Sequence, residues 1–599
     1  MRYPKLTELE TSRQMVDTFR GYNHNLRISD GEFYDMINMT SDCYPVLSPR
    51  KNRGVYASPG SPQGLIAKDA LCYVDGTEFV MNEYRIDMGL SDGPKQLISM
   101  GAYVIIMPDK KWINTKCWIS EDEFDTENGW GNIESEFTTQ AEVRFSLCKL
   151  DGTDFSDGDI QTTEPSDPEN LELWIDTSTE PHSLKQWSKS SGMWVTIATT
   201  YVKITSPGIG AGFEQYDGIT ISGLSGALHD AVSDDIIPDT GDLAALEGAA
   251  VVWERGDDYI VVVGILDSVK TITDSITVSR KMPKMDFVIE SDNRLWGCRY
   301  GEANNGEVVN EIYASKLGDF KNWSCYMGLS TDSYTASCGT DGQFTGAITH
   351  LGYPLFFKEN CVHKVYGNYP ANFQIQATAC QGVQKGCHNS LAIVNTTLLY
   401  KAQSGVMAYD GSLPASVSYA LGSEAYSEAV GGAHGNKYYI SMKDSMGAYH
   451  LFVYDMAKSM WHREDDLLAE CFCSCGGELY AIAGGQIITM LGSGTVSTEP
   501  VEWMAQTGEI GLGSPDMKYI SRLTIRLSME IGAKISILAK YDFSTEWEEL
   551  YSYTARNLCS FSVPVRPRRC DHMTLRIEGQ GQVRIYSITK TIEQGSELS

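Results

Sequence analysis

The sequence predicts an all-β protein built around a β-propeller of six or seven blades, with an inserted β-rich module and a C-terminal β-sandwich. Along most of the chain, short apolar runs are separated by tight turns that contain Gly, Asn or Asp, as in β-hairpins. These hairpins recur at intervals of about 40 residues, which is typical of propeller blades. The 56 Gly and 20 Pro among 599 residues provide for many turns.

The clearest hairpins lie in the middle of the chain. Residues 355–370 read LFFKENCVHKVYGNYP, and residues 398–418 read LLYKAQSGVMAYDGSLPASVS. In each stretch an apolar run leads into a polar turn and a second apolar run follows. We expect each stretch to form two paired strands of one blade.

The N-terminal half of the chain divides into three regions. Residues 1–53 are polar, with few strand signals, and are predicted to form an N-terminal arm. Residues 54–113 are predicted to form the first blades, because Asp75-Gly76 between two apolar runs is a strong hairpin signal. Residues 118–170 are rich in Asp, Glu, Ser and Thr and have sparse strand signals, and strand-like runs return from Leu171. We therefore expect 114–280 to be an inserted β-rich module whose two ends lie close together.

The propeller pattern resumes after the insertion. Residues 281–499 are predicted to form the remaining blades, with Trp296 and Trp323 buried in them. Residues 500–599 differ, because apolar and polar residues alternate faithfully, as at Ile520, Leu523, Ile525 and Leu527. Such alternation gives strands with one face on a core and one in water. This region is predicted to be a small β-sandwich.

Several of these stretches resemble the tail and DNA-stabilisation proteins of tailed bacteriophages, of the tail hub or nozzle type. The residues that carry the resemblance are Lys358-Glu359-Asn360 with Val365-Tyr366-Gly367, and Gly405-Val406 with Tyr409-Asp410-Gly411. Residues 31–54 resemble the opening of that family, and residues 568–597 resemble its close. The resemblance skips about 117–280, and none of its motifs is catalytic.

The resemblance implies a virion structural protein rather than an enzyme. Its role would be to join parts of the neck or tail, as a hub, nozzle or stabilisation ring, and to line or close the DNA path. It implies a ring of identical copies, of which we expect six. The other expected partners are a portal adaptor, tail tube or fibre, with viral DNA only in transit. Two alternatives remain open: a tail-tip adhesin that binds surface glycan, and a propeller glycosidase.

The charge and the cysteines bear on where such a protein works. The formal net charge of −30 argues against tight binding of nucleic acid. It fits either a solvated acidic surface or a conduit wall that repels DNA. The 15 scattered Cys argue for synthesis in a reducing compartment, such as a host bacterial cytoplasm, before incorporation into the virion. The chain has no apolar run near 20 residues, so no stable membrane insertion is expected.

Two sets of residues are candidates for contact with partners. The basic set, for another protein or DNA, comprises Arg50, Lys51, Arg53, Arg566, Arg568 and Arg569. The aromatic set, for stacking against a glycan, comprises Trp174, Trp187 and Trp194. The alternatives are packing of the basic residues against acidic neighbours and a core cluster of the three Trp.

Other patterns indicate no catalytic, cofactor or metal site. Cys471, Cys473 and Cys475 alternate, whereas zinc sites use paired spacings, so a core role is favoured. The group Cys380, Cys387 and His388 has no fourth ligand nearby. Residues 151–159 have oxygen ligands at alternate places but no distal Glu of a calcium loop. Residues 208–212 are glycine-rich but have no phosphate-binding Lys. Ser191 to Trp194 form only a fragment of a sialidase motif.

Overall fold

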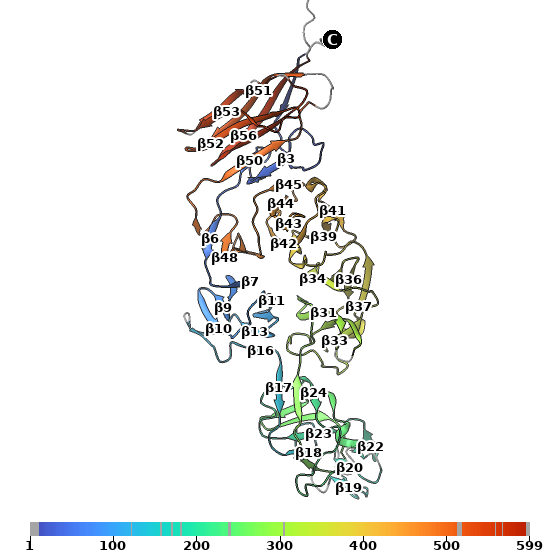
Figure 1. Cartoon of the computed structure of the whole chain (residues 1–599). Coiled ribbons are helices and arrows are strands. Elements are labelled where there is room, and N and C mark those ends of the chain that lie inside the picture. The colour runs from blue at the N-terminus through green and yellow to red at the C-terminus, as the bar shows by residue number, and fades with distance from the viewer. Residues whose placement is uncertain are drawn as a thin grey trace, which may run out of the picture.

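The computed structural model describes residues 11–120, 123–155, 159–168, 172–179, 182–237, 241–266, 268–303, 306–511, 518–557, 559–565, 567–568 and 570–594. Over these residues the chain is all-β, as predicted, with 56 strands, one short helix, α1 (Gly241–Ala244), and three 3₁₀ segments. None of the described helices is long and apolar enough to cross a membrane. Three parts follow one another in space: a terminal unit, a central group of small sheets and an inserted unit (Figure 1).

The central part is built from four-stranded antiparallel units, and the described residues contain seven of them. In five units all four strands are consecutive in the chain, because each tight turn returns the chain beside the strand just formed. In the other two units the first three strands are consecutive and the fourth comes from elsewhere in the chain.

Five units are separate sheets. Their strands are β7 (Pro62–Ala67), β8 (Leu71–Asp75), β9 (Glu78–Met81) and β10 (Tyr84–Asp87); β11 (Gln96–Met100), β12 (Tyr103–Met107), β13 (Lys111–Asn114) and β16 (Trp130–Asn132); β30 (Phe287–Ser291), β31 (Arg294–Glu302), β32 (Val308–Ala314) and β33 (Tyr334–Ser337); β34 (Phe344–His350), β35 (Tyr353–Lys358), β36 (Cys361–Tyr366) and β37 (Gln374–Ala379); and β38 (Ala392–Val394), β39 (Thr397–Ala402), β40 (Gly405–Tyr409) and β41 (Ala415–Ser416).

The last two units belong to larger sheets. One consists of β42 (Ser427–His434), β43 (Lys437–Lys443), β44 (Tyr449–Asp455) and β45 (Met460–Arg463). The other consists of β46 (Cys471–Cys475), β47 (Glu478–Ala483), β48 (Gln486–Thr489) and β6 (Gly54–Ala57), extended by β49 (Thr495–Val496). The remaining short elements are the hairpin β14 (Trp118–Ser120) with β15 (Glu123–Phe124), and the 3₁₀ segments η1 (Pro370–Asn372), η2 (His388–Ser390) and η3 (Tyr419–Leu421).

The first strands of the seven units follow one another around a closed circle. Strand β7 contacts β11, β11 contacts β30, and β30 contacts β34. Segment η2 contacts both β34 and β42, and β38 also contacts β42. The circle closes because β42 contacts β46 and β46 contacts β7. We call this part, residues 54–132 and 287–489, the sheet ring.

Strand β6 joins the two ends of the sheet ring. It precedes the first unit in sequence but pairs with β48 of the last unit, with Val55 opposite Ile488. Gly54 is required there, because a Cβ atom would lie 1.8 Å from the carbonyl oxygen of Ser493. The Gly54 N–H also donates a hydrogen bond to the side-chain hydroxyl of Thr489 at 3.0 Å, across a separation of 435 residues.

Apolar side chains fill the spaces between neighbouring sheets of the ring. Trp296 is 3% exposed and Trp323 is 2% exposed, which confirms that both are buried. Trp296 lies in β31, whereas Trp323 follows β32 in a connection. The two side chains belong to neighbouring clusters, so both contribute to packing of one sheet on the next.

The terminal unit consists of two sheets. One contains β1 (Thr11–Val16), β56 (Val583–Gln594), β51 (Lys518–Met529) and β54 (Cys559–Val565), in that order. The other continues the β42–β45 unit through β2 (Gly21–Tyr22), β3 (Glu32–Ile37), β50 (Glu502–Thr507), β55 (Met573–Gln580), β52 (Lys534–Tyr541) and β53 (Glu548–Thr554). The short pair β4 (Met39–Thr40) and β5 (Ser48–Pro49) lies beside β56.

Alternation in the C-terminal strands places their apolar residues between the two sheets. Leu523 and Ile525 of β51 share one buried cluster with Ile535 and Ile537 of β52 and with Ile577 of β55. The alternating pattern therefore gives the core of this unit.

Residues 11–53 were expected to form an arm, and the structure places them within sheets. Strand β1 pairs with β56, and β3 pairs with β50. Phe19, Tyr22, Phe33 and Met36 are buried in the cluster that also contains the C-terminal strands. The sequence does not reveal this role, because the partner strands lie near the other end of the chain.

The inserted unit, residues 135–280, contains three sheets. They are formed by β17 (Ser135–Thr138), β29 (Thr277–Arg280), β24 (Gly218–Ser222) and β25 (Gly248–Val251); by β26 (Glu254–Gly256), β27 (Tyr259–Val263), β23 (Tyr201–Thr205), β18 (Val143–Cys148) and β28 (Lys270–Ile272); and by β19 (Ile160–Gln161), β20 (Leu173–Asp176), β21 (Ser183–Ser188) and β22 (Met193–Ile197).

The inserted unit begins later in the chain than the predicted 114. Strand β16 pairs with β13, and Phe124 packs in the core of the sheet ring with Trp118 and Trp130 beside it. The acidic composition after residue 117 concealed these apolar contacts. The two ends of the unit are adjacent, since Ser135 lies opposite Arg280.

Candidate functional site

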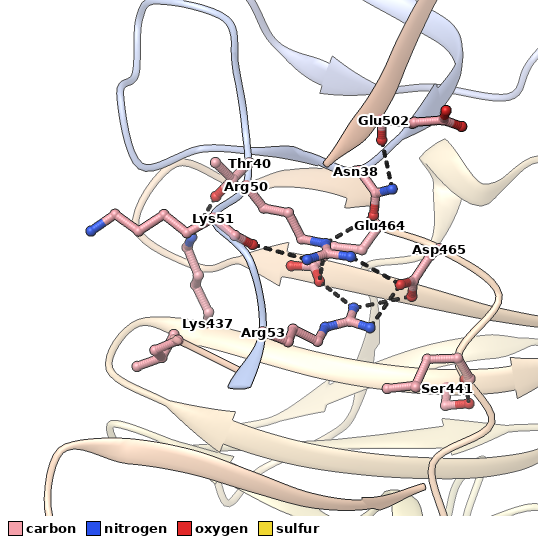
Figure 2. Close-up of polar contacts among 12 residues, drawn as sticks. Asn38, Thr40, Arg50, Lys51, Arg53, Lys437, Ser441, Glu464, Asp465 and Glu502 are labelled. Carbon is pink, nitrogen blue, oxygen red and sulfur yellow. Dashed lines mark hydrogen bonds and ion pairs between the residues drawn. The ribbon is translucent and has the colours of Figure 1, made fainter. Parts of the chain in front are cut away.

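The basic residues predicted near residue 50 lie where the sheet ring joins the terminal unit. Arg50 and Arg53 follow β5, in the segment that leads into β6. Glu464 and Asp465 follow β45, the strand of the sixth unit that continues into the terminal unit. Figure 2 shows the two guanidinium groups pointing at the two carboxylates. We call these four residues the charged joint.

Each guanidinium of the charged joint meets both carboxylates. Arg53 Nη2 lies 2.7 Å from Glu464 Oε2, and Arg53 Nη1 lies 2.7 Å from Asp465 Oδ2. Arg50 Nη2 lies 3.1 Å from Asp465 Oδ2, and Arg50 Nε lies 3.5 Å from Glu464 Oε2. The side chains are 7–27% exposed, so two positive and two negative charges compensate one another away from bulk water.

Opposite charges in the joint favour the charged forms of Asp465 and Arg53. Burial alone would raise the pKa of Asp465, but Arg53 and Arg50 lower it below its usual value. Burial alone would likewise lower the pKa of Arg53, but Glu464 and Asp465 raise it. An unpaired buried charge is costly, so removal of one partner would destabilise the others.

The charged joint also contacts the strand that returns to the terminal unit. Arg50 Nε donates a hydrogen bond to Asn38 Oδ1 at 2.8 Å. Asn38 Nδ2 in turn donates to the carbonyl oxygen of Glu502, the first residue of β50, at 2.8 Å (Figure 2). The joint thus ties together both segments of chain that pass between the sheet ring and the terminal unit.

A second polar group on the same connection extends the joint. Arg463, the last residue of β45, lies 3.1 Å from Asp35 of β3 and 2.8 Å from Asp466. His450 lies between Asp444 and Asp466, at 2.8 and 3.1 Å. Sequence reasoning did not single out these residues. The only available signal was the acidic run Glu464-Asp465-Asp466, whose charge is opposite to that of the basic run near residue 50.

The other predicted basic residues lie outside the charged joint. Lys51 is exposed, and its side chain points away from the four charged groups (Figure 2). Arg568 lies 3.7 Å from Glu548 and packs over the ring of Tyr541, with its side chain 61% exposed. Arg566 and Arg569 lie outside the described residues. The described members of the basic set therefore do not form one positive surface.

The three predicted Trp residues come together in the β19–β22 sheet of the inserted unit. The rings of Trp174 and Trp194 have centroids 5.4 Å apart, and those of Trp187 and Trp194 are 5.6 Å apart. Trp174 is 5% exposed, whereas Trp187 and Trp194 are half-buried. Both pairs are edge-to-face, an arrangement that aromatic rings prefer.

The cysteines and the histidine considered as metal ligands pack against apolar or aromatic neighbours. Cys471, Cys473 and Cys475 lie in β46 and pack against the apolar cluster that contains Leu65 and Ile482. Cys387 is buried in the large core cluster, and His388 packs against Phe287. Within the described residues, no group of three His, Cys, Asp or Glu side chains is placed to hold a metal ion.

The acidic and glycine-rich loops of the inserted unit have structural contacts as well. In the segment 151–159, Asp154 lies 3.1 Å from Arg144 and 3.6 Å from Lys203, while residues 156–158 lie outside the described residues. In the segment 208–212, a Cβ atom on Gly210 would lie 1.9 Å from the carbonyl oxygen of Gly256.

An opening of about 640 Å³ is lined by residues of five first strands of the sheet ring, β11, β30, β34, β42 and β46. Its polar lining includes Lys95, Gln96, Asp286, His388 and Asn389. A glycosidase needs two carboxyl groups about 5–10 Å apart, one with a raised pKa. Among the described carboxyl groups with a resolved shift, only that of Asp217 is raised in pKa, by burial, and Asp217 lies outside this opening, paired with Arg280.

The comparisons with known proteins assign this chain to no family. No family model matches the chain, and no curated protein matches it. Among solved structures, an exo-β-1,3-galactanase from Phanerochaete chrysosporium is 9% identical, with 50% of this chain and 95% of that chain covered and a TM-score of 0.19.

Two further solved structures cover more of the chain. PorZ, a surface component of the type IX secretion system of Porphyromonas gingivalis, is 10% identical, with 92% of this chain and 75% of that chain covered and a TM-score of 0.25. A Trypanosoma rangeli sialidase is 8% identical, with 90% and 96% covered and a TM-score of 0.18. At TM-scores of 0.18 to 0.25, these three structures support no conclusion about the function of this chain.

Proposed function

We propose that this chain is a virion structural protein of a tailed bacteriophage, part of the neck or tail as a hub, nozzle or stabilisation ring. The observation that carries the proposal is the meeting of the two ends of the family resemblance. Segments 31–54 and 568–597 supply the strands on either side of β50, since β3 and β55 both pair with it. Lys590 also lies 2.8 Å from Asp30, 560 residues away. The opening and the close of the resemblance therefore lie together in the terminal unit.

The fold proposed with this role is a seven-bladed propeller. Each four-stranded unit of the sheet ring is one blade, and β6 closes the ring by completing the last blade. The central resemblance, 355–370 and 398–418, supplies strands of two consecutive blades, β35–β36 and β39–β40. The terminal unit is then a β-sandwich, with its core between the two sheets.

The charged joint supports a mechanical role. A ten-stranded sheet continues from the sixth unit of the ring into the terminal unit, and the buried ion pairs brace the same passage. Such a connection resists bending between the two parts. This stiffness suits a protein that joins tail components and transmits load between them.

The DNA path in this proposal lies between copies of the chain. An opening of about 640 Å³ is the size of a small-molecule pocket and is too small for a DNA duplex. Several copies in a rotationally symmetric ring would enclose a wider channel. We propose six copies, whose acidic surfaces would repel DNA at short range and let it slide.

Two measurements test the proposal. Native mass spectrometry of the purified full chain should give a closed ring, with six copies expected. Electron micrographs of particles that carry a tagged copy should place the tag on the tail axis, at the neck or tail. A chain that stays monomeric at all concentrations and is absent from purified particles would overturn the proposal.

The glycosidase alternative predicts a different result. The virion role predicts that the purified chain hydrolyses neither glycans nor phosphodiesters. Hydrolysis that is abolished by substitution of one Asp or Glu would replace the structural role with an enzymatic one.

A further inference from the structure

The β19–β22 sheet has two different faces. Ile175 and Leu184 belong to the core of the inserted unit, and Ile197 packs against that core. Successive side chains of a strand point to opposite faces. Trp174, one position from Ile175, therefore lies on the face away from this core, and so does Trp194, three positions from Ile197.

The cross-strand register gathers six residues on that second face. Trp174 lies opposite Lys185, which lies opposite Thr196. Trp187 lies opposite Trp194, and Asp176 is two positions beyond Trp174. We call this set the Trp face: Trp174, Asp176, Lys185, Trp187, Trp194 and Thr196.

The Trp face is separate from the core of the inserted unit. None of its three Trp residues belongs to the buried cluster that holds Ile175 and Leu184. The half-buried rings of Trp187 and Trp194 pack on each other instead, and Trp194 covers Trp174. A role confined to the core does not account for large apolar rings that remain partly open on the outer face of a sheet.

Polar groups on the Trp face are already held in place. Lys185 Nζ lies 2.6 Å from Asp176 Oδ2 and 4.6 Å from the centre of the Trp174 ring. Asp176 also accepts a hydrogen bond from the backbone N–H of Ser178 at 2.9 Å. Trp174 Nε1 donates to the carbonyl oxygen of Gln161 at 2.8 Å. A ligand would therefore meet an ordered surface, so little conformational entropy is lost on binding.

One donor on this face has no partner. Trp194 Nε1 is buried and makes no hydrogen bond within the described structure. A buried polar group without a partner is unusual and costs stability. The exposed hydroxyl of Thr196 lies two positions away on the same strand.

We propose that the Trp face binds an uncharged glycan through a pyranose ring that stacks on Trp187 and Trp194. A pyranose has an apolar C–H surface for the aromatic rings and a rim of hydroxyl groups for Lys185 and Thr196. The charge of Lys185 is neutralised by Asp176, so the face has no net positive charge to attract a phosphate or a sialic acid. The net charge of −30 also disfavours nucleic acid as the ligand.

This inference does not depend on the virion role, because it concerns only the inserted unit. A glycan-binding face is compatible with a tail protein that touches a host surface and with other roles. Glycan binding by the Trp face can therefore be tested independently of ring formation.

A printed array of neutral, sialylated and phosphorylated oligosaccharides, probed with the full chain, gives the first measurement. Neutral glycans should bind, and saturation-transfer NMR should place the contact on pyranose C–H protons. Trp187→Ala and Lys185→Ala should each weaken binding at least tenfold, about 1.4 kcal/mol. No binding to any glycan at about 1 mM, or preference for charged glycans, would overturn the proposal.

Two variants separate binding from folding. Met193→Ala is the matched control, since Met193 is on the same hairpin, on the opposite face and 57% exposed, and its binding should equal that of the wild type. Trp187→Phe keeps an aromatic ring against Trp194 and should lose only about two- to threefold. If Trp187→Ala unfolds the inserted unit, Trp187→Phe and Thr196→Ala decide the question: unchanged binding in both contradicts the assignment.

Discussion

The sheet ring carries the terminal unit and the inserted unit through attachments of different kinds. The terminal unit continues a sheet of the ring, with Tyr22 of β2 opposite Trp461 of β45. The inserted unit is connected through its paired end strands, β17 and β29, and makes polar contacts with Asn322 and Lys321 of the ring. Strand pairing and a shared core couple two regions in folding, whereas a small polar contact sets only their orientation.

The polar contacts of the inserted unit gather around Tyr216 to Gly218. Asn322 of the ring accepts a hydrogen bond from the Gly218 N–H at 3.1 Å and donates one to the Tyr216 carbonyl oxygen at 2.8 Å. Asp217 is paired with Arg280, which also donates to the carbonyl oxygen of Ile133 at 3.3 Å. Gly218 permits the close approach, since a Cβ atom would lie 2.4 Å from Ser324 backbone atoms.

The largest expected difference between the two attachments is the effect of removing each unit on cooperative unfolding of the remaining chain. Replacement of 135–280 by a short Gly/Ser linker should leave one cooperative unfolding transition, because Ser135 and Arg280 are directly opposite each other. Truncation after residue 499 should abolish cooperative unfolding, because Phe33 and Met36 lose the C-terminal part of their shared core. Differential scanning calorimetry of both shortened chains tests the contrast. Loss of cooperativity in the first chain would mean that the inserted unit is part of the ring core.

The next largest effect is expected at the charged joint. Arg53→Ala leaves Glu464 and Asp465 short of a buried partner and should cost about 3–5 kcal/mol in the free energy of unfolding. Urea unfolding of the ring and terminal unit measures this change. Lys51→Ala is the neighbouring control and should change stability by less than about 0.5 kcal/mol. A loss below about 1 kcal/mol in Arg53→Ala would show that the joint does not brace the two parts.

A smaller effect is expected where the inserted unit meets the ring. Asn322→Ala removes two hydrogen bonds of a fully buried side chain and should cost about 1–3 kcal/mol. Hydrogen exchange at the Gly218 amide should become faster, because that amide loses its acceptor. Lys321→Ala, which removes the outer contact with Glu214, should leave this exchange unchanged. Equal exchange in wild type and Asn322→Ala would place the anchoring contact elsewhere.

The Trp face should make the inserted unit sensitive to acid. Burial alone would raise the pKa of Asp176, but hydrogen bonds from Lys185 and Ser178 lower it from 3.8 to about 2. Because the pKa is lower in the folded state, the stabilisation is present above about pH 4 and is lost as the pH falls toward 2. Asp176→Asn should cost about 1 kcal/mol at pH 7, and most of this difference should be lost at pH 2. A difference between the two proteins that does not change with pH would contradict this assignment.

The smallest expected signal is binding of DNA. Arg50 and Arg53 are paired with Glu464 and Asp465, and the formal net charge of the chain is −30, which repels phosphate. The free chain should bind duplex DNA only weakly at physiological salt, as measured by fluorescence anisotropy. Sub-micromolar binding that falls in Lys51→Ala or Arg568→Ala would reveal a phosphate site on the exposed basic residues.

Local patterns in the sequence predicted many individual strands and hairpins. Asp75-Gly76 lies at the end of β8 and the turn into β9, and the alternation at Leu523, Ile525 and Leu527 lies on the buried face of β51. Turn chemistry and alternation act between residues a few positions apart, so they can be read directly from the chain. The three Trp of the inserted unit were also found in this way, as apolar residues in neighbouring runs.

Only the tertiary structure decided how these strands combine. Residues 11–53, which were predicted to be an arm, contribute strands to two larger sheets. The inserted unit begins at 135 rather than at the predicted 114. Arg50 and Arg53 pair with acidic residues over 400 positions away. The common face of Trp174, Trp187 and Trp194 likewise depends on the register of three strands. Local periodicity specifies that a strand forms and which of its faces is apolar, but the choice of neighbouring strand depends on packing and charge compensation between distant segments.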